Sequence, residues 1–195
     1  MLASPGNGPQ PLDVLATVVG VLAGFAARAN SFLIRKTTGV YTELLRNLPL
    51  LVKLFFMYFV LGLPALPAAI VALTLHQSAY IADVTAAGLR TVARGQFDAA
   101  RSLGLRTGSV YRLVVLPQML RVMTPPMTSQ YVSIVKNSSV VALIGVADLT
   151  FQTQQINIDT FRGFEAATAV TVLYALLAGS IIVAMTRLQR RQKQS

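Results

Sequence analysis

Apolar residues fill most of the chain in long stretches, which short polar or basic segments separate. A helix that crosses the hydrocarbon core of a bilayer needs about 17–25 residues, and five stretches come close to or reach this length. We expect membrane-spanning helices at residues 12–29, 41–63, 66–89, 117–146 and 166–186. No soluble domain boundary is visible, so the pattern predicts an all-α membrane protein with a single transmembrane domain over residues 1–195.

Composition supports lipid as the solvent. Charged residues are 12% of the 195 residues, about half of the fraction typical of soluble domains. Lys and Arg number 17 against 7 Asp and Glu, a balance that in a soluble protein would suggest nucleic-acid binding. Here the basic residues cluster between apolar stretches, so we expect contact with membrane lipid and no nucleic-acid partner. With no Cys, the chain has neither a disulfide framework nor a Cys-based metal site.

The distribution of basic residues predicts the orientation of the chain. Cytoplasmic loops carry an excess of Lys and Arg. Fourteen of the 17 basic residues fall on one predicted side, in three groups: Arg28, Arg35, Lys36 and Arg46; Arg90, Arg94, Arg101, Arg106, Arg112 and Arg121; and Arg187, Arg190, Arg191 and Lys193. We therefore expect the 90–121 segment and the C-terminus in the cytoplasm. The N-terminal stretch MLASPGNGPQP lacks the basic region of a signal peptide and is interpreted as a short polar lead-in on the outer side.

The cytoplasmic segment 90–116 has its own local pattern. Its first part, around residues 97–104, alternates charged and apolar residues at helical spacing. The charged face holds Arg94, Asp98 and Arg101, and the opposite face holds Phe97, Ala100 and Leu103. The pattern is typical either of an amphipathic connector on lipid headgroups or of a docking element for a soluble partner. Amphipathicity alone leaves both possibilities open.

Helix start and stop signals within this segment predict a helix–Gly–helix elbow. Gly104 suits the left-handed position that closes a helix. Thr107 is expected to cap a second helix over 108–116. Pro117 would then begin the fourth span, since proline is favoured in the first helical turn.

The same residues resemble a known motif. DAARSLGLRTGSVYRLVVLP (98–117) resembles the EAA loop of permease subunits of ATP-binding-cassette (ABC) importers, in the MetI-like family. The motif residues are Asp98, Ala99, Ala100, Gly104, Val114, Leu116 and Pro117, with Asp98 in place of Glu and Val114 in place of Ile. Further stretches at 41–59, 79–105, 116–126 and 130–150 resemble the polar amino-acid branch of this family. Members of the family have a longer first span than this chain.

The resemblance implies a function and a set of partners. It implies a permease subunit for polar amino acids in the bacterial inner membrane, paired with a second permease subunit. ATP would act on separate ATPase subunits, an extracytoplasmic binding protein would deliver the solute, and this chain would bind no cofactor. In the family this loop is the coupling helix that meets the ATPase. The docking residues are then expected to be Asp98, Ala99, Ala100 and Gly104, with Leu116 and Pro117.

Polar residues within the predicted spans are the candidates for a translocation path or gate. Lys136 lies inside an apolar stretch, where a lysine costs roughly 2.5–3.5 kcal/mol on insertion scales, so it should face protein or water. Asn137, Ser138 and Ser139 follow it, and hydrogen bonds between helices are their alternative role.

Other polar residues have plainer interpretations. Lys53 is expected to extend its ammonium to the membrane surface. Asp83 is expected to pair with Arg90 or Arg46, and Arg46 to orient the entry to the second span. His76, the only histidine, is interpreted as a core residue because no metal-ligating residues accompany it.

The sequence argues against an enzyme and leaves other transporters open. No phosphate-binding Gly-rich loop, catalytic triad or pair of carboxylates is present. The alternatives are an ion-coupled secondary transporter, which would need intramembrane acids, a channel or membrane scaffold, and a sensor with the same fold.

Overall fold

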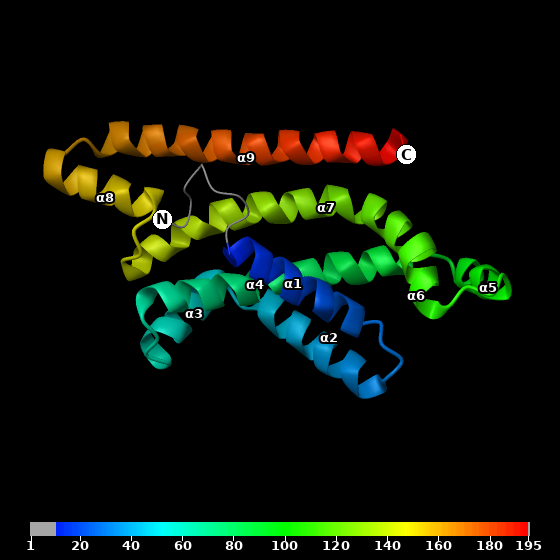
Figure 1. Ribbon diagram of the computed structural model, residues 1–195. Helices are drawn as coiled ribbons and strands as arrows, with labels where there is room; N and C mark the ends of the chain where they lie inside the picture. Colours follow the sequence, from blue (N-terminus) through cyan, green and yellow to red (C-terminus); the bar gives the residue numbers. More distant parts are fainter. Residues whose placement is uncertain (1–10, 195) are drawn as a thin grey trace.

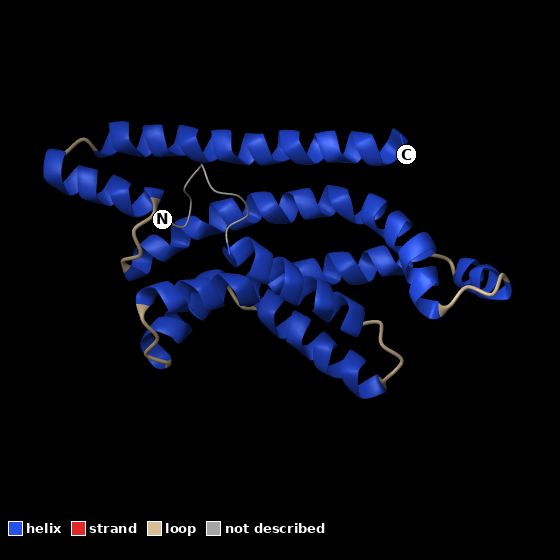
Figure 2. Cartoon of the chain, viewed as in Figure 1, coloured by secondary structure: helices blue, strands red, loops and turns tan. Residues whose placement is uncertain are grey.

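The computed structural model describes residues 11–194, and within them every regular element is a helix (Figures 1 and 2). The expected polar lead-in lies almost wholly outside the described residues. The elements are α1 (Pro11–Ala26), α2 (Phe32–Asn47), α3 (Leu50–Phe55), a π-helical turn (Phe56–Val60), α4 (Ala65–Arg90), α5 (Arg94–Ser102), α6 (Thr107–Val110), a second π-helical turn (Tyr111–Val115), α7 (Leu116–Asn137), a 3₁₀ helix (Ser138–Ile144), α8 (Leu149–Thr160) and α9 (Gly163–Gln194).

Helix length and hydropathy single out the membrane-crossing elements. Among the described residues, α4 and α9 are each long and apolar enough to span a bilayer. A third candidate is the continuous helix Thr107–Ile144 together with α8, which bend by 46° relative to each other. Residues Val14–Ala26 and Leu50–Val60 form shorter apolar helices.

The structure changes two of the expected boundaries. The stretch 41–63 is not one helix, because the chain breaks at Leu48 and Pro49 between α2 and α3. Proline lacks a backbone N–H and clashes with the preceding turn, so the helix cannot continue through it. The segment 147–165, expected as a loop, contains α8.

Helix α4 is the centre of the fold and packs against α1 along much of its length. Two glycines of α1 permit this close approach. A Cβ on Gly20 would lie 2.6 Å from Ile81 Cβ, and one on Gly24 would lie 2.4 Å from Thr85 Cβ. The spacing is the G-x-x-x-G pattern that allows two membrane helices to touch backbone to backbone. This signal is readable in the sequence as Gly20 and Gly24, four residues apart within one apolar stretch.

Two apolar clusters fill the space around α4. One joins Leu54 of α3 and Ala72 of α4 to Val141 of the 3₁₀ helix. The other joins Ile81 and Leu89 of α4 to residues of the elbow and of α7: Ala100, Val110, Val115, Met119 and Met123. The second cluster fixes the elbow to the membrane helices, which sets the position of α5.

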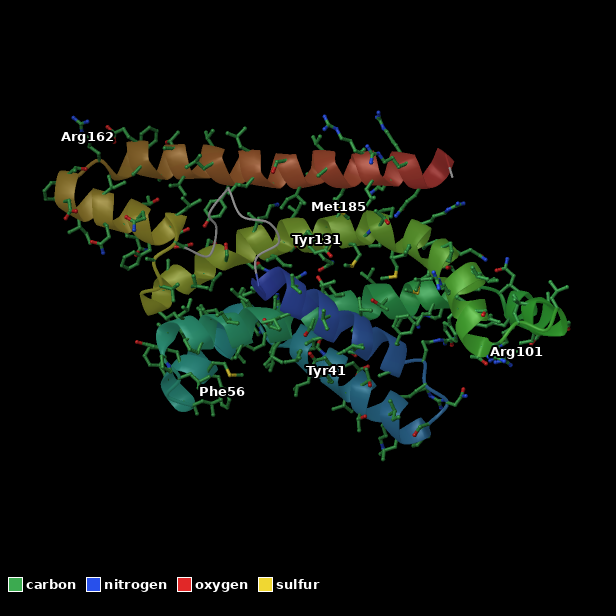
Figure 3. All side chains as sticks on the ribbon, in the orientation of Figure 1. Tyr41, Phe56, Arg101, Tyr131, Arg162 and Met185 are labelled. Carbon is green, nitrogen blue, oxygen red and sulfur yellow. The ribbon has the colours of Figure 1, made fainter. Side chains whose placement is uncertain are left out.

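Three separate segments lie at one end of the molecule, where Figure 3 shows Arg101 of α5. Figure 1 shows the connection between α1 and α2, the elbow formed by α5 and α6, and the C-terminal end of α9 at the right-hand end. The opposite end carries α8 and the turn that follows α3. These three segments hold eight of the 17 basic residues of the chain, so positive charge gathers at one end, as the sequence predicts.

Candidate functional site: the elbow and the polar positions within the helices

Helix α5 projects at the basic end of the molecule and has two different faces (Figure 1). Its inner face is held by Ala100, which is 4% exposed, and by Phe97, whose ring meets that of Tyr111 edge to face with 5.9 Å between centroids. Asp98 and Ala99 are exposed. Among the described residues Asp98 forms no ion pair, so its carboxylate is open to a partner. The amphipathic helix predicted here is confirmed, and it begins at Arg94 rather than at residue 97.

Gly104 closes α5 as predicted. Its φ is +77°, a backbone conformation that favours glycine. The Leu105 N–H donates to the Ala100 carbonyl at 3.2 Å, and the Gly104 N–H donates to the Arg101 carbonyl at 2.9 Å. This pair of bonds is the Schellman motif, which satisfies the last carbonyls of the helix. A substitution at Gly104 would therefore act through the backbone, since a Cβ there meets no atom within 4 Å.

The second half of the elbow differs from the prediction. Thr107 does not cap a separate helix; it is the first residue of α6, and Arg106 occupies the cap without a side-chain hydrogen bond. The helix continues through the π-helical turn Tyr111–Val115 into α7. Leu116 and Pro117 thus lie inside one continuous helix, both exposed. The wider π-helical turn precedes the proline and leaves room for its ring, so the helix does not end there.

The four gate candidates lie where α7 ends. Asn137 is its last residue, and Ser138 opens the 3₁₀ helix that stops at Gly145, with φ +78°. The hydroxyl groups of Ser138 and Ser139 donate to backbone carbonyls three residues earlier in the same helical segment. Ser138 donates to Val135 at 2.8 Å, and Ser139 donates to Lys136 at 2.7 Å. These bonds use the hydroxyl protons within the helix, so the roles expected for this group, in a translocation path or between helices, stay predictions. Ser138 also interacts with the hydroxyl of Tyr174 on α9.

A buried carboxylate next to this segment was not singled out from the sequence. Asp148 is 6% exposed and caps α8, accepting from the Phe151 N–H at 2.8 Å. The Tyr174 hydroxyl of α9 donates to its other oxygen at 3.1 Å. An aspartate three residues before a backbone donor at a helix start is a recognised N-cap signal. It ties α8 to α9 at the end opposite the elbow.

The expectation for Lys53 is wrong. Its side chain is buried, at 4% exposed, and does not reach the membrane surface. The ammonium donates to the Leu45 carbonyl at 2.6 Å and lies 2.7 Å from His76 Nδ1. Pro49 supplies no N–H to the Leu45 carbonyl, and Lys53 takes that place. His76 is half-buried and partnered, as predicted, and no group of metal-ligating residues occurs within the described part of the chain.

Asp83 pairs with Arg46, one of the two partners predicted for it. The Arg46 guanidinium also lies over the Tyr80 ring, 5.4 Å from its centroid. Both contacts join the end of α2 to α4 and hold the chain just before the break at Pro49. The prediction that Arg46 orients the entry to the second span agrees with this position.

An all-helical membrane subunit with a basic elbow at one end is the class that this architecture defines. Residues 16–194 match the family described as binding-protein-dependent transport system inner membrane component, and the chain belongs to this family. Members of this family are transport subunits of the inner membrane.

Individual relatives agree with the family. The chain is 34% identical over 183 residues to the glutamine transport system permease protein GlnP of Escherichia coli (strain K12), covering 90% of this chain and 84% of that protein. It is 29% identical over 196 residues to the glutamate/aspartate import permease protein GltJ of the same organism, with 91% and 80% covered. The sequence resemblance to permease subunits of ABC importers is thus confirmed.

Solved structures show the same fold. A crystal structure of an amino acid ABC transporter with histidines superposes with a TM-score of 0.81 at 32% identity, covering 92% of this chain and 88% of that chain. An inward-facing MetNI methionine ABC transporter superposes with a TM-score of 0.75 over the same shares at 23% identity, and this likeness concerns the fold alone.

Proposed function

We propose that the chain is the permease subunit of an ABC importer for polar amino acids. The relatives are named for glutamine and for glutamate and aspartate, which supports this substrate class. The chain would work with ATPase subunits, a second permease subunit and an extracytoplasmic binding protein, and would bind no cofactor itself. The C-terminus would be cytoplasmic, because the basic end of the molecule carries it.

The observation that carries the coupling role is the exposed outer face of α5. Asp98 and Ala99 are open to solvent, while Ala100 and Phe97 anchor the opposite face. Small side chains let a partner surface approach closely, and an unpaired carboxylate offers a fixed charge for register. The ATPase would therefore dock on Asp98 and Ala99. Ala100, also expected at the docking surface, is buried and would instead hold α5 against the bundle, while Gly104 keeps the end of the helix in place.

Movement of the docked ATPase would pass into the membrane through a single helix. Leu116 and Pro117 lie within the continuous helix that starts at Thr107. Residues 103–106 and the packing of Ala100 against this helix connect it to α5, so a shift of α5 would be passed on to α7. The permease would alternate between inward-open and outward-open arrangements because the ATPase binds them with different affinities.

The solute path would pass the end of α7. Lys136 is exposed in the isolated chain, and Asn137 and Ser139 are partly so. A lysine within an apolar membrane segment needs a polar neighbour. A solute carboxylate in a path between two permease subunits would meet that need. The exposed apolar residues of α9, including Leu176, Ile182 and Val183, would contact lipid or the second subunit.

Co-purification with the ATPase subunit tests the docking role. Asp98→Arg reverses the exposed charge, and Gly104→Pro forces φ to about −65° at a position that needs +77°. We expect both variants to insert into the membrane normally and to lose the ATPase.

Gly95→Ala is the matched control, because it adds the same kind of atom to open space on α5 without a positive φ. It should retain the ATPase. Full retention by Asp98→Arg and Gly104→Pro would refute docking at α5. Uptake by reconstituted protein that runs on an ion gradient without any ATPase would refute the importer itself.

A further inference from the structure

A small pocket lies between the elbow and the membrane helices, and neither Asp98 nor Ala99 lines it. Its volume is about 250 Å³, and its walls come from the end of α1, the α1–α2 connection, the end of α4, α5 and the second π-helical turn. Figure 1 shows these elements together at the basic end of the molecule. The residues that decide its chemistry are Phe25, Arg28, Asn30, Arg94, Phe97 and Tyr111.

Positive charge in this pocket is not balanced by any acid. Arg28 and Arg94 both line it and both are exposed, and its lining contains no Asp or Glu. The one salt bridge among the described residues joins Arg46 and Asp83, so neither pocket arginine is paired there. Two guanidinium groups that line the same space repel each other, and an anion between them offsets that repulsion. Asn30 adds an amide donor.

The backbone of α5 adds to the positive electrostatic potential in the pocket. Helix α5 begins at Arg94, and its cap residue Ala93 has no side chain that could accept from the free N–H groups of the first turn. The N-terminus of a helix carries a partial positive charge and favours anions. This contribution is small beside the two arginines, but it has the same sign.

The remaining lining indicates which anion fits. Phe25, Leu89, Val92 and Phe97 form an apolar floor, and Phe25 lies in the last turn of the apolar helix α1, at the edge of the membrane-embedded part. The volume is smaller than the range of about 300–1,000 Å³ that drug-sized ligands occupy. A phosphate can bind two guanidinium groups in paired hydrogen bonds, and basic pockets at the ends of membrane helices bind phospholipid headgroups.

We propose that this pocket binds the phosphate group of an anionic phospholipid such as phosphatidylglycerol. Arg28 and Arg94 hold the phosphate oxygens, Asn30 donates to the headgroup, and the apolar floor covers the glycerol and the first acyl carbons. The lipid then fills the joint between α1, α4 and the elbow, and it sets how firmly α5 is held against the bundle. The site is separate from the docking face of α5 and does not depend on which solute is carried.

Native mass spectrometry of the full chain purified in detergent tests this proposal. The protein is titrated with dioleoyl phosphatidylglycerol, with dioleoyl phosphatidylcholine and with inorganic phosphate. We expect one phosphatidylglycerol per chain to be retained in preference to phosphatidylcholine. Arg28→Gln with Arg94→Gln should weaken this binding by about tenfold or more, because it removes both charged donors to the phosphate.

The matched control is Arg35→Gln with Lys36→Gln, which removes the same charge from exposed positions of α2 that do not line the pocket. It should bind phosphatidylglycerol like the wild type. Arg94→Lys keeps the charge but loses the paired geometry, so it should bind with intermediate strength, which separates an ionic contact from a folding defect.

Other outcomes are equally informative. Binding of inorganic phosphate that the double variant loses, without lipid preference, would support the phosphate site and assign it a soluble ligand. Equal retention of phosphatidylglycerol by the wild type and both double variants would overturn the proposal. Loss of the ATPase subunit from the Arg28 and Arg94 variant with lipid binding unchanged would overturn it too, since the arginines would then belong to a protein interface.

Discussion

The ammonium of Lys53 lies 2.6 Å from the carbonyl oxygen of Leu45, eight residues earlier in the chain. The two residues stand on opposite sides of the break at Pro49. In an unbroken helix the N–H of residue 49 would bond to that carbonyl, and proline has none. A buried lysine thus satisfies the carbonyl that a proline leaves unbonded, and it joins α2 to α3.

Replacing Lys53 should therefore destabilise the fold. Lys53→Met leaves the Leu45 carbonyl unbonded, and an unsatisfied buried polar group costs about 1–3 kcal/mol. The measurement is unfolding of the purified protein in detergent as a function of denaturant. Lys36→Met on the exposed face of α2 is the control and should change little. Adding Pro49→Ala to Lys53→Met restores a backbone donor and should recover part of the loss; no recovery would contradict this account.

The Arg46–Asp83 pair should be exchangeable. Both side chains are nearly half exposed, at 46% and 41%, so each single charge reversal should cost about 1 kcal/mol or less. Arg46→Asp with Asp83→Arg should be more stable than either single variant, because the pair is re-formed in the opposite sense. A double-mutant cycle in the same unfolding assay measures the coupling. Strict additivity would show that the pair contributes nothing.

Replacing a glycine of α1 with alanine, the smallest possible enlargement, should destabilise the protein. Gly24→Ala places a methyl group 2.4 Å from Thr85 Cβ and 2.8 Å from the Ala82 carbonyl oxygen, so α1 must move away from α4. Overpacking of this kind costs about 1–3 kcal/mol. Gly39→Ala on α2 adds the same group to open space and should be neutral or slightly stabilising. Melting temperatures of the two variants in detergent distinguish them, and equal values would contradict close α1–α4 packing.

Asp148 should contribute more to the stability of α8 than its partner Tyr174 does. Asp148→Ala removes the N-cap and should cost about 0.5–2 kcal/mol. Tyr174→Phe leaves the cap in place and removes only one hydrogen bond. Amide hydrogen exchange should rise in the first turn of α8 in Asp148→Ala and much less in Tyr174→Phe. Asp159→Ala, at an exposed position of the same helix, is the control.

Much of the fold follows from local signals in the sequence. The apolar stretches locate α1, α4, α7 and α9, and the positive φ of Gly104 follows from its place at the end of an amphipathic helix. The Arg46–Asp83 pair was also within reach, because a charged residue near the end of a span needs a neighbour of opposite charge.

Features that depend on packing between distant segments could not be predicted in the same way. Lys53 looks like any lysine near the end of a span, and only the position of His76 and of the break at Pro49 turns it inward. The helix continues through Pro117 because a π-helical turn precedes it, and no residue pattern in the sequence predicts such a turn. The pocket at Arg28 and Arg94 joins residues 66 positions apart, so the spacing of charges could not reveal it.

The unbroken run from Thr107 to Asn137 has a mechanical consequence. At 1.5 Å per residue these 31 residues extend about 46 Å, so a tilt of about 5° at the elbow displaces the far end by about 4 Å. A displacement of that size exceeds the width of a water molecule and occurs next to Asp148 and α8. The coupling acts in both directions, because whatever immobilises the far end of the helix also restricts the end at the elbow. Binding near α8 would therefore change the position of α5 through this one helix.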